Sequence, residues 1–254
     1  ANREKALLQD LDYENGYSLY VGIPFCPSIC LYCSFGSHPL ERWTKRVDEY
    51  LDTLCKELTF IREQMGTRKL TTVYIGGGTP TTLEPEQLRR LLSHIQETFD
   101  FTWVKEYTVE AGRPDSITEE KLKVIKNHDI TRISINPQSM QQKTLDVIGR
   151  KHTVEEIKEA YALARKTGFD NINMDIIAGL PGEDISDMED TLAQIAQMHP
   201  DSLTVHSLAI KRAARMERED LNRDAKETHE ILSGMIERAA KAAKAVSYTH
   251  LTLP

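Results

Sequence analysis

Three cysteines lie close together near the start of the sequence. Cys26, Cys30 and Cys33 are separated by three and two residues, on a segment rich in turn-forming residues. Thiolates are the usual ligands of iron–sulfur clusters, and a standard cluster takes four of them. A loop with three cysteines would therefore leave one iron open to an exogenous ligand. The spacing predicts an iron–sulfur site.

A zinc site is the alternative interpretation of these cysteines. Structural zinc sites commonly add a second, distant pair of Cys or His ligands, and this sequence offers His38 but no such pair. A non-enzymatic zinc-binding interaction module is therefore the less favoured hypothesis. Cys55 falls on an apolar helical pattern over residues 47–61, so we expect it to be a small buried hydrophobe.

Composition points to a water-soluble protein that handles a small molecule. The 254 residues carry 32 Lys and Arg against 39 Asp and Glu, a net charge of -7, which gives no basic surface for nucleic acid or anionic membrane. No apolar run approaches the roughly 20 residues that span a bilayer, and residues 1–12 lack a signal-peptide core. We expect a cytoplasmic monomer.

Short β-branched runs alternate with longer helical patterns, as in strand–helix units stacked around a parallel sheet. Apolar spacing predicts helices over residues 47–61 and 88–95, among others. Periodicity alone leaves two folds open, a doubly wound sheet and an incomplete barrel. The predicted strands are residues 18–22, 72–75, 106–110, 132–136, 171–177 and 202–207.

Helix boundaries are marked by capping patterns. Gly168 stands where a helix should end. Three Ser or Thr residues are each followed three positions later by Glu, which predicts N-caps. The pairs are Ser116 with Glu119, Thr153 with Glu156, and Ser186 with Glu189.

Unusual residues follow the predicted strands. The cysteines come after the first strand and a glycine-rich segment, residues 76–80, after the second, while Glu110, Gln138 and Asp175 lie at or near the ends of three others. In both candidate folds ligands gather at the carboxyl ends of the strands. We therefore expect one common site there.

The chain divides into four predicted parts. Residues 1–16 are a lead-in, 17–211 form the core domain, and 212–246 read as the helical start of a truncated C-terminal region. Residues 247–254 have no helical periodicity and no evident partner segment. We interpret them as an artefactual tail, with a genuine strand leading to a further domain as the alternative.

The cysteine motif, with Tyr32 before the last cysteine, resembles the radical S-adenosylmethionine (SAM) superfamily. Further segments resemble the oxygen-independent coproporphyrinogen III oxidase family, and the resemblance extends over residues 17–215. It implies an α/β fold, a partial (β/α)6 TIM-like barrel. The segments are SLYVGIPFC (residues 18–26), YIGGGTP (74–80), RISINPQ (132–138), IGRKH (148–152) and DIIAGLP (175–181).

The resemblance also implies the cofactors and the residues that bind them. Cys26, Cys30 and Cys33 would hold a 4Fe-4S cluster, and Tyr20 would lie beside the sulfonium of SAM as a catalytic residue. The other implied SAM-binding residues are Tyr32, Gly77, Gly78, Thr79, Glu110, Gln138, Arg150, Asp175 and Ala209, the last through its backbone.

Histidines are harder to assign. His152 adjoins the implied SAM ligand Arg150 and His206 lies on the last predicted strand, so a site role stays open for both. The remaining candidates, expected on helix surfaces or in loops, are His94, His128, His199 and His229.

The implied reaction is oxidative decarboxylation. A cluster reduced by an electron donor such as flavodoxin or ferredoxin would cleave SAM to a 5′-deoxyadenosyl radical. Two propionates of coproporphyrinogen III would then become the vinyl groups of protoporphyrinogen IX. The chain departs from the family pattern after the cluster loop, where Cys-Gly-Cys is usual but this chain reads Cys33-Ser34-Phe35-Gly36 without the extra cysteine, and in Gly22, where a histidine is usual. A haem chaperone without decarboxylase activity is therefore the alternative prediction.

Overall fold

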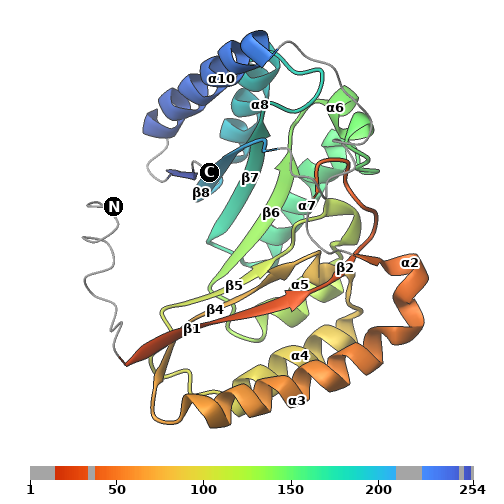
Figure 1. The fold of residues 1–254 in the computed structure, drawn as a ribbon, viewed down its shortest axis with the longest axis vertical. Coiled ribbons are helices and arrows are strands. Elements are labelled where there is room, and N and C mark those ends of the chain that lie inside the picture. Colours follow the sequence, from red (N-terminus) through yellow and green to blue (C-terminus); the bar gives the residue numbers. More distant parts are fainter. Residues whose placement is uncertain (1–14, 34–37, 210–224, 246–248, 253–254) are drawn as a thin grey trace.

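The computed structural model describes residues 15–33, 38–209, 225–245 and 249–252. Six long strands form a curved sheet in which neighbours follow chain order and every pair is parallel (Figure 1). All six predicted strands are confirmed, within a few residues at their ends. They are β1 (Gly16–Ile23), β4 (Lys69–Gly77), β5 (Glu106–Glu110), β6 (Arg132–Gln138), β7 (Ile172–Ala178) and β8 (Ser202–Ser207).

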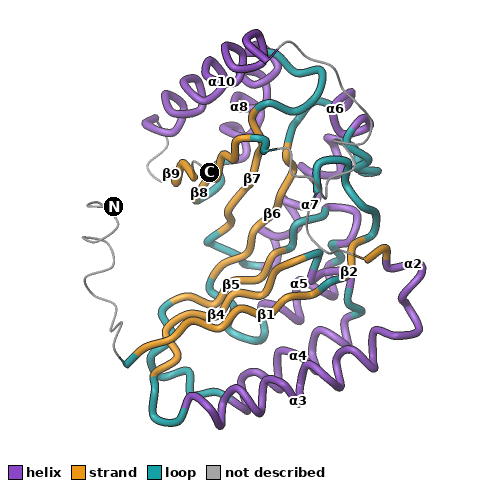
Figure 2. Tube along the Cα trace, in the orientation of Figure 1, coloured by secondary structure: helices purple, strands orange, loops and turns teal. Residues whose placement is uncertain are grey.

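Helices cover the convex face of the sheet (Figure 2). A strand order without reversal, joined by right-handed crossovers, places the connecting helices on one side. This selects the partial (β/α)6 barrel over the doubly wound sheet. The helices are α2 (Leu40–Trp43), α3 (Val47–Met65), α4 (Pro85–Thr98), α5 (Glu119–Lys126), α6 (Gln142–Val147), α7 (Val154–Thr167), α8 (Ile185–Met198) and α10 (Ala225–Ala245).

The barrel stays open between its two edge strands. β1 forms one edge, and a short strand, β9 (Thr249–Thr252), pairs in parallel with β8 at the other. The prediction that residues 247–254 lack a partner segment is therefore wrong for these four. An unpaired strand edge presents free backbone N–H and C=O groups that a neighbouring strand can satisfy. Whether the tail is artefactual remains a prediction.

Alternation along each strand separates the core from the concave face. In β1, Leu19, Val21 and Ile23 are buried in the hydrophobic core, whereas Tyr20 between them is 62% exposed. Successive strand side chains point to opposite faces, so alternate positions of a strand serve packing and the site. The helix α10 joins the same core through Met235, which is fully buried.

Two of the expected helix boundaries are confirmed. Thr153 caps α7 and accepts a hydrogen bond from the backbone N–H of Glu156, whose side chain bonds back in a capping box. Gly168 ends the same helix in the left-handed region, with φ of 99°.

The other two predicted N-caps are wrong by two residues. Thr118 caps α5 in place of Ser116, whose hydroxyl donates to the carbonyl of Arg113 in a preceding 3-10 turn, Pro114–Ser116. Asp184 caps α8 in place of Ser186, which lies inside the first turn. In both segments the true cap, Thr118 or Asp184, is the last residue with extended backbone before the helix, and its side-chain oxygen accepts from the first turn.

A further turn and a small ribbon complete the described elements. Two short strands, β2 (Phe25–Cys26) and β3 (His38–Pro39), pair beside the end of β1, and 3-10 turns cover Thr44–Arg46 and Pro80–Thr82. Within the described ranges, no helix has both the length and the apolar character needed to cross a membrane.

Candidate functional site

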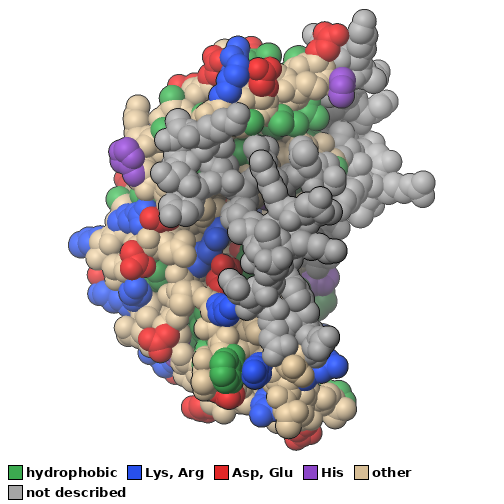
Figure 3. All heavy atoms as spheres, turned by 90° about the vertical axis from the view of Figure 1, so that its left-hand side faces the viewer, with side chains coloured by type: hydrophobic (Ala, Val, Ile, Leu, Met, Phe, Trp, Pro, Cys, Tyr) green, Lys and Arg blue, Asp and Glu red, His purple; other side chains and the backbone are tan. Residues whose placement is uncertain are grey.

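A cavity of about 580 Å³ opens on the concave face, at the carboxyl ends of the strands. Figure 3 views this open side, where acidic and basic side chains gather in the middle of the face. Every one of the six long strands contributes to the lining. The volume lies in the range of about 300–1,000 Å³ that small-molecule sites occupy.

The cavity brings together the predicted site residues with one exception. Ala209 does not line it and is exposed beyond the end of β8. The predicted residues that line it are Tyr20, Cys26, Cys30, Tyr32, Cys33, Gly77, Gly78, Thr79, Glu110, Gln138, Arg150 and Asp175.

The cysteine loop is anchored to the turn after α6. The backbone N–H of Leu31 donates to the carbonyl of Ile148 at 2.9 Å, and the Ser28 hydroxyl donates to the carbonyl of Gly149 at 3.0 Å. Cys30 is buried, while Cys26 and Cys33 are half-buried. These bonds tie the loop to a distant part of the chain, which gives the thiols a defined position at the cavity.

The three thiols share this cavity without forming a compact ligand set. Among the described residues, no three His, Cys, Asp or Glu side chains are grouped closely enough to hold a metal ion. Cys26 Sγ accepts a bond from the Thr79 hydroxyl at 3.5 Å, and burial raises the pKa of this thiol. Holding a metal cluster would therefore require the thiol side chains to turn toward a common point and ionise.

The glycine-rich segment lies directly against the cysteine loop. The N–H of Gly78 donates to the carbonyl of Ile23, and the N–H of Thr79 donates to that of Phe25 at 2.8 Å. A Cβ atom on Gly78 would stand 2.6 Å from the Phe25 carbonyl oxygen and 3.0 Å from Cys26 Sγ. Glycine is thus required here for close packing against backbone.

Glu110 lies at the end of β5 with the hydroxyl of Tyr74 donating to it. Burial raises the pKa of Glu110 to about 7, with the negative charge of Asp175 adding to the effect and the Tyr74 bond opposing it. Tyr20 stacks on Tyr74 with ring centres 5.9 Å apart. The exposed aromatic ring and a carboxyl group that titrates near neutrality form one wall of the cavity.

Gln138 and Arg150 carry buried polar atoms without partners. Oε1 of Gln138 and Nε of Arg150 are fully buried and make no hydrogen bond in the described part of the chain. Arg150 is held by other atoms, donating through Nη2 to the Tyr32 hydroxyl at 3.3 Å. Buried polar groups are almost always satisfied, so these two orphaned atoms, on residues that line the cavity, are available to a polar ligand.

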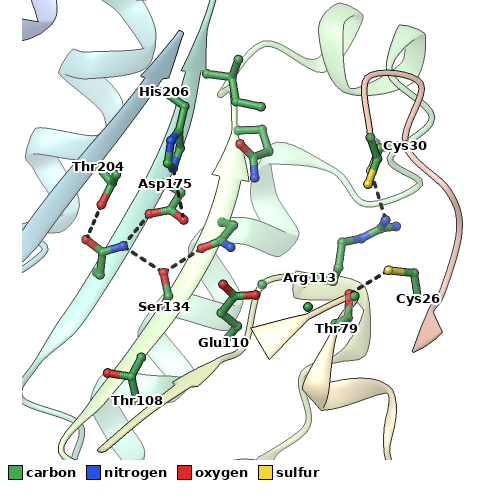
Figure 4. A pocket seen from close by; sticks show the side chains of 18 of the residues that line it. Cys26, Cys30, Thr79, Thr108, Glu110, Arg113, Ser134, Asp175, Thr204 and His206 are labelled. Atoms are coloured by element: carbon green, nitrogen blue, oxygen red, sulfur yellow. Dashed lines mark hydrogen bonds and ion pairs between the residues drawn. The ribbon is translucent and has the colours of Figure 1, made fainter. Parts of the chain in front are cut away.

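A hydrogen-bonded network of small polar side chains that the sequence motifs did not predict lines the cavity (Figure 4). Asn173 donates to Ser134 at 2.9 Å, Ser134 donates to Asn136 at 2.8 Å, and Thr204 donates to Asn173 at 3.1 Å. The signal was present, because polar residues recur at every second position of these strands.

His206 faces the same network. Its Nε2 lies 3.9 Å from Oδ2 of Asp175, and this carboxylate raises the pKa of the imidazole. The open question about His206 therefore resolves in favour of a place in the cavity lining.

His152 is enclosed beside the cysteine loop. It is 1% exposed, and Nδ1 lies 3.7 Å from Oδ1 of Asp115. Burial lowers the pKa of His152, so the ring is neutral at pH 7. It does not line the cavity, so its contribution is to the support of the site.

Several single-residue expectations need correction. His128 is buried, with ring contacts to the Val124 carbonyl and the Ser93 hydroxyl, because the end of α5 packs against α4. Cys55 is half-buried, since it lies at the flank of the buried stripe of α3. His38 is exposed beside Trp43 and does not line the cavity.

His94, His199 and His229 follow the expectation. His199 and His229 are exposed, and His94 is half-buried on α4 with its ring near the Cys55 carbonyl. These three do not line the cavity.

Comparison with known families identifies the superfamily of this chain. A family model described as the radical SAM superfamily matches residues 20–195. The chain belongs to the radical SAM superfamily. The resemblance read from the cysteine motif is thereby confirmed, and membership implies a 4Fe-4S cluster and SAM as cofactors.

Relatives of this radical SAM chain are named for porphyrin or haem chemistry. The oxygen-independent coproporphyrinogen-III oxidase-like protein HemZ of Bacillus subtilis is 46% identical over 221 residues, 85% of this chain and 44% of the relative. The haem chaperone HemW of the same organism is 35% identical over 195 residues, 76% of this chain and 51% of that protein.

A solved radical SAM structure confirms the fold. Coproporphyrinogen III oxidase (HemN) from Escherichia coli superposes with a TM-score of 0.79 at 27% identity, covering 94% of this chain and 56% of that one. The chain spans about half the length of the curated relatives it matches.

Proposed function

We propose that Cys26, Cys30 and Cys33 hold a 4Fe-4S cluster and that the adjoining cavity binds SAM. The observation that carries the proposal is that the cysteine loop, the glycine segment and the strand-end polar residues all line one cavity. The donor set suits the cluster, because three thiolates leave one iron for an exogenous ligand. The orphaned atoms of Gln138 and Arg150 suit a polar cofactor beside it.

Together, the cluster and SAM would supply one-electron cleavage of SAM and hydrogen abstraction from an unactivated carbon. The residues of this chain would position SAM. Arg150 offers donors for a carboxylate, Glu110 and Asp175 offer acceptors for hydroxyl or ammonium groups, and Tyr20 presents an exposed ring. Arg150 is buried and Glu110 half-buried, which limits the competition of water for these contacts.

The proposed reaction is oxygen-independent oxidative decarboxylation of coproporphyrinogen III to protoporphyrinogen IX. Its support is the 46% identity to a coproporphyrinogen-III oxidase-like protein and the structural similarity to a coproporphyrinogen III oxidase. A one-electron donor such as flavodoxin or ferredoxin and a monomeric state belong to the same proposal.

A haem chaperone is the second candidate. It is favoured by the 35% identity to HemW and by Gly22, which leaves the strand beside Tyr20 without the histidine usual in the oxidase pattern. The other departure, Ser34 to Gly36, lies outside the described residues.

Anaerobic reconstitution separates the two candidates. The full-length protein would be loaded with iron and sulfide, then given SAM, a reductant and coproporphyrinogen III. Protoporphyrinogen IX and methionine as products support the decarboxylase. Stoichiometric haem binding without vinyl product supports the chaperone, and zinc without iron in the purified protein would contradict both.

A further inference from the structure

A buried arginine outside the predicted set contacts the cysteine loop. Arg113 lies three residues beyond the end of β5 and is 3% exposed. Its Nη1 lies 3.6 Å from Sγ of Cys30, the most buried of the three thiols, as drawn in Figure 4. The same guanidinium donates to the hydroxyl of Ser28 at 3.0 Å and to the Ser28 carbonyl at 3.3 Å.

Asp115 holds this guanidinium from the other side. Its two oxygens accept from Nε and Nη2 of Arg113 at 3.1 and 2.9 Å, a two-pronged pairing that fixes the plane of the group. His152 packs beside Asp115 as a neutral, buried ring. Arg113 is therefore a rigidly placed cation whose remaining donors all point into the cysteine loop.

We propose that Arg113 is a positioning residue that orients the Cys30 thiolate and raises the reduction potential of a cluster bound there, with Asp115 moderating its charge. This inference rests on the proposed cluster at the three cysteines. It goes further in assigning a role to two residues outside the proposed SAM-binding set.

The direction of the effect follows from charge. Reduction adds a negative charge to a cluster, and a fixed cation within a few ångströms, in a place shielded from water, stabilises that charge. Hydrogen bonds to the cluster sulfurs and the net local charge are among the main determinants of iron–sulfur potentials. Loss of the Arg113 charge should lower the potential, and loss of the Asp115 charge should raise it.

A second arginine near the thiol does not substitute for Arg113. Arg150 also interacts with Cys30, and it donates through Nη1 and Nη2 to the carbonyls of Gly112 and Asn136 and to the Tyr32 hydroxyl. Arg150 belongs to the residues proposed to bind SAM, so replacing it would change SAM binding as well as the cysteine loop, whereas Arg113 lies outside that set although it also lines the cavity.

The test is a redox titration of the anaerobically reconstituted full-length protein, followed by the electron paramagnetic resonance signal of the reduced cluster. In R113Q, the ratio of reduced to oxidised cluster at a fixed potential should fall at least tenfold, a shift of about 59 mV for a one-electron couple. D115N should shift the titration in the opposite direction. R113K keeps the positive charge but loses the two-pronged hydrogen bonding of the guanidinium, so its reduction potential should lie between those of wild type and R113Q.

R165Q is the matched control. It removes the same charge from an arginine that pairs with Asp201 at 2.7 Å on the outer helix α7, and it should leave the titration unchanged. Iron content, measured for every variant, reports whether the cluster assembles.

The outcomes separate this inference from the proposed function. Absence of a cluster in the wild-type protein refutes the proposed function. If the wild type assembles a cluster, equal shifts in R113Q and R165Q, or shifts of the same sign in R113Q and D115N, overturn only the role of Arg113. If R113Q assembles no cluster, D115N decides the question. A higher reduction potential in D115N than in wild type supports the inference, and an unchanged or lower potential refutes it.

Discussion

The cysteine side chains differ in their surroundings although they share one short loop. Cys30 is buried against Arg113, Cys26 contacts Thr79, and Cys33 is half-buried at the end of the described loop. A fourth cysteine, Cys55, lies away from the cavity on α3. Cys55 can therefore serve as the control when the other three cysteines are replaced.

At this scale, we expect replacement of Cys26, Cys30 or Cys33 by Ala to abolish cluster binding. Each substitution removes one of three ligands, so the broad visible absorption near about 400 nm should be lost along with bound iron. C55A should retain both. Absorption and iron that persist in C30A would contradict the assignment of that thiol.

Glu110 gives a prediction in pH. Its pKa rises from an ordinary 4.5 to about 7 on folding, mainly through burial. Below pH 4.5 the carboxyl is protonated in both states. As pH rises, the unfolded state ionises first, so the free energy of unfolding falls between pH 4.5 and about 7, by up to about 3 kcal/mol.

E110Q should remove this dependence. Urea unfolding of the protein without cofactors, measured at several pH values, checks it: the difference between E110Q and wild type should grow in favour of E110Q from pH 4.5 to about 7 and then level off. A difference that stays constant over this range would show that Glu110 does not titrate there.

At the scale of elements, two loops from successive strands pack together to form the site. The segment after β4 lies on the cysteine loop through backbone bonds from Gly78 and Thr79. Within the described residues, the cysteine loop has sheet pairing here only in the two-residue strand β2 (Phe25–Cys26), so the approach of backbone to backbone largely sets the geometry of the two loops. Small residues are needed where the chains touch.

G78A tests this packing. An added Cβ would meet the carbonyl oxygens of Phe25 and Ile23 at 2.6 and 2.8 Å, and we expect a loss of about 1–3 kcal/mol in the free energy of unfolding together with weaker cluster retention. G22A is the matched control, because its Cβ would meet only the Tyr20 ring, at 3.4 Å. Equal effects of the two substitutions in chemical denaturation would refute the packing argument.

On the scale of the whole molecule, the helix α10 and the barrel share one hydrophobic core. Met235 and Ala239 are fully buried in the cluster that includes residues of β7 and α8. The sulfur of Met235 also accepts a bond from the N–H of Gly179, just after β7. The helical stretch predicted for residues 212–246 is confirmed over 225–245 and packs on the barrel.

M235A should therefore destabilise the barrel as well as the helix. Removing a fully buried Met side chain costs about 2–5 kcal/mol, and the loss should appear as a single shift of the whole denaturation curve. K241A, at an exposed position of the same helix, should change stability by less than about 0.5 kcal/mol. A separate early transition in M235A would show that α10 unfolds independently.

The sequence by itself determined the features that depend on local spacing. The cysteine motif, the alternation of strands with helices, the glycine segment and the polar residues at strand ends are all legible within a few residues, because ligand spacing and the pleat of a strand are short-range properties. They were sufficient to predict strand–helix units around a parallel sheet with a common site at the strand ends, and the resemblance to the radical SAM superfamily selected the partial barrel.

Only the tertiary structure decided which distant residues meet at that site. Arg113 reaches Cys30 across 83 residues, and Asn173 joins Ser134 from the neighbouring strand. A run of polar residues looks alike whether it faces solvent or a cavity, and the curvature of the sheet determines which of these it faces. Tertiary structure likewise distinguishes the two histidines that the sequence left open, because His206 faces the cavity and His152 is enclosed outside it.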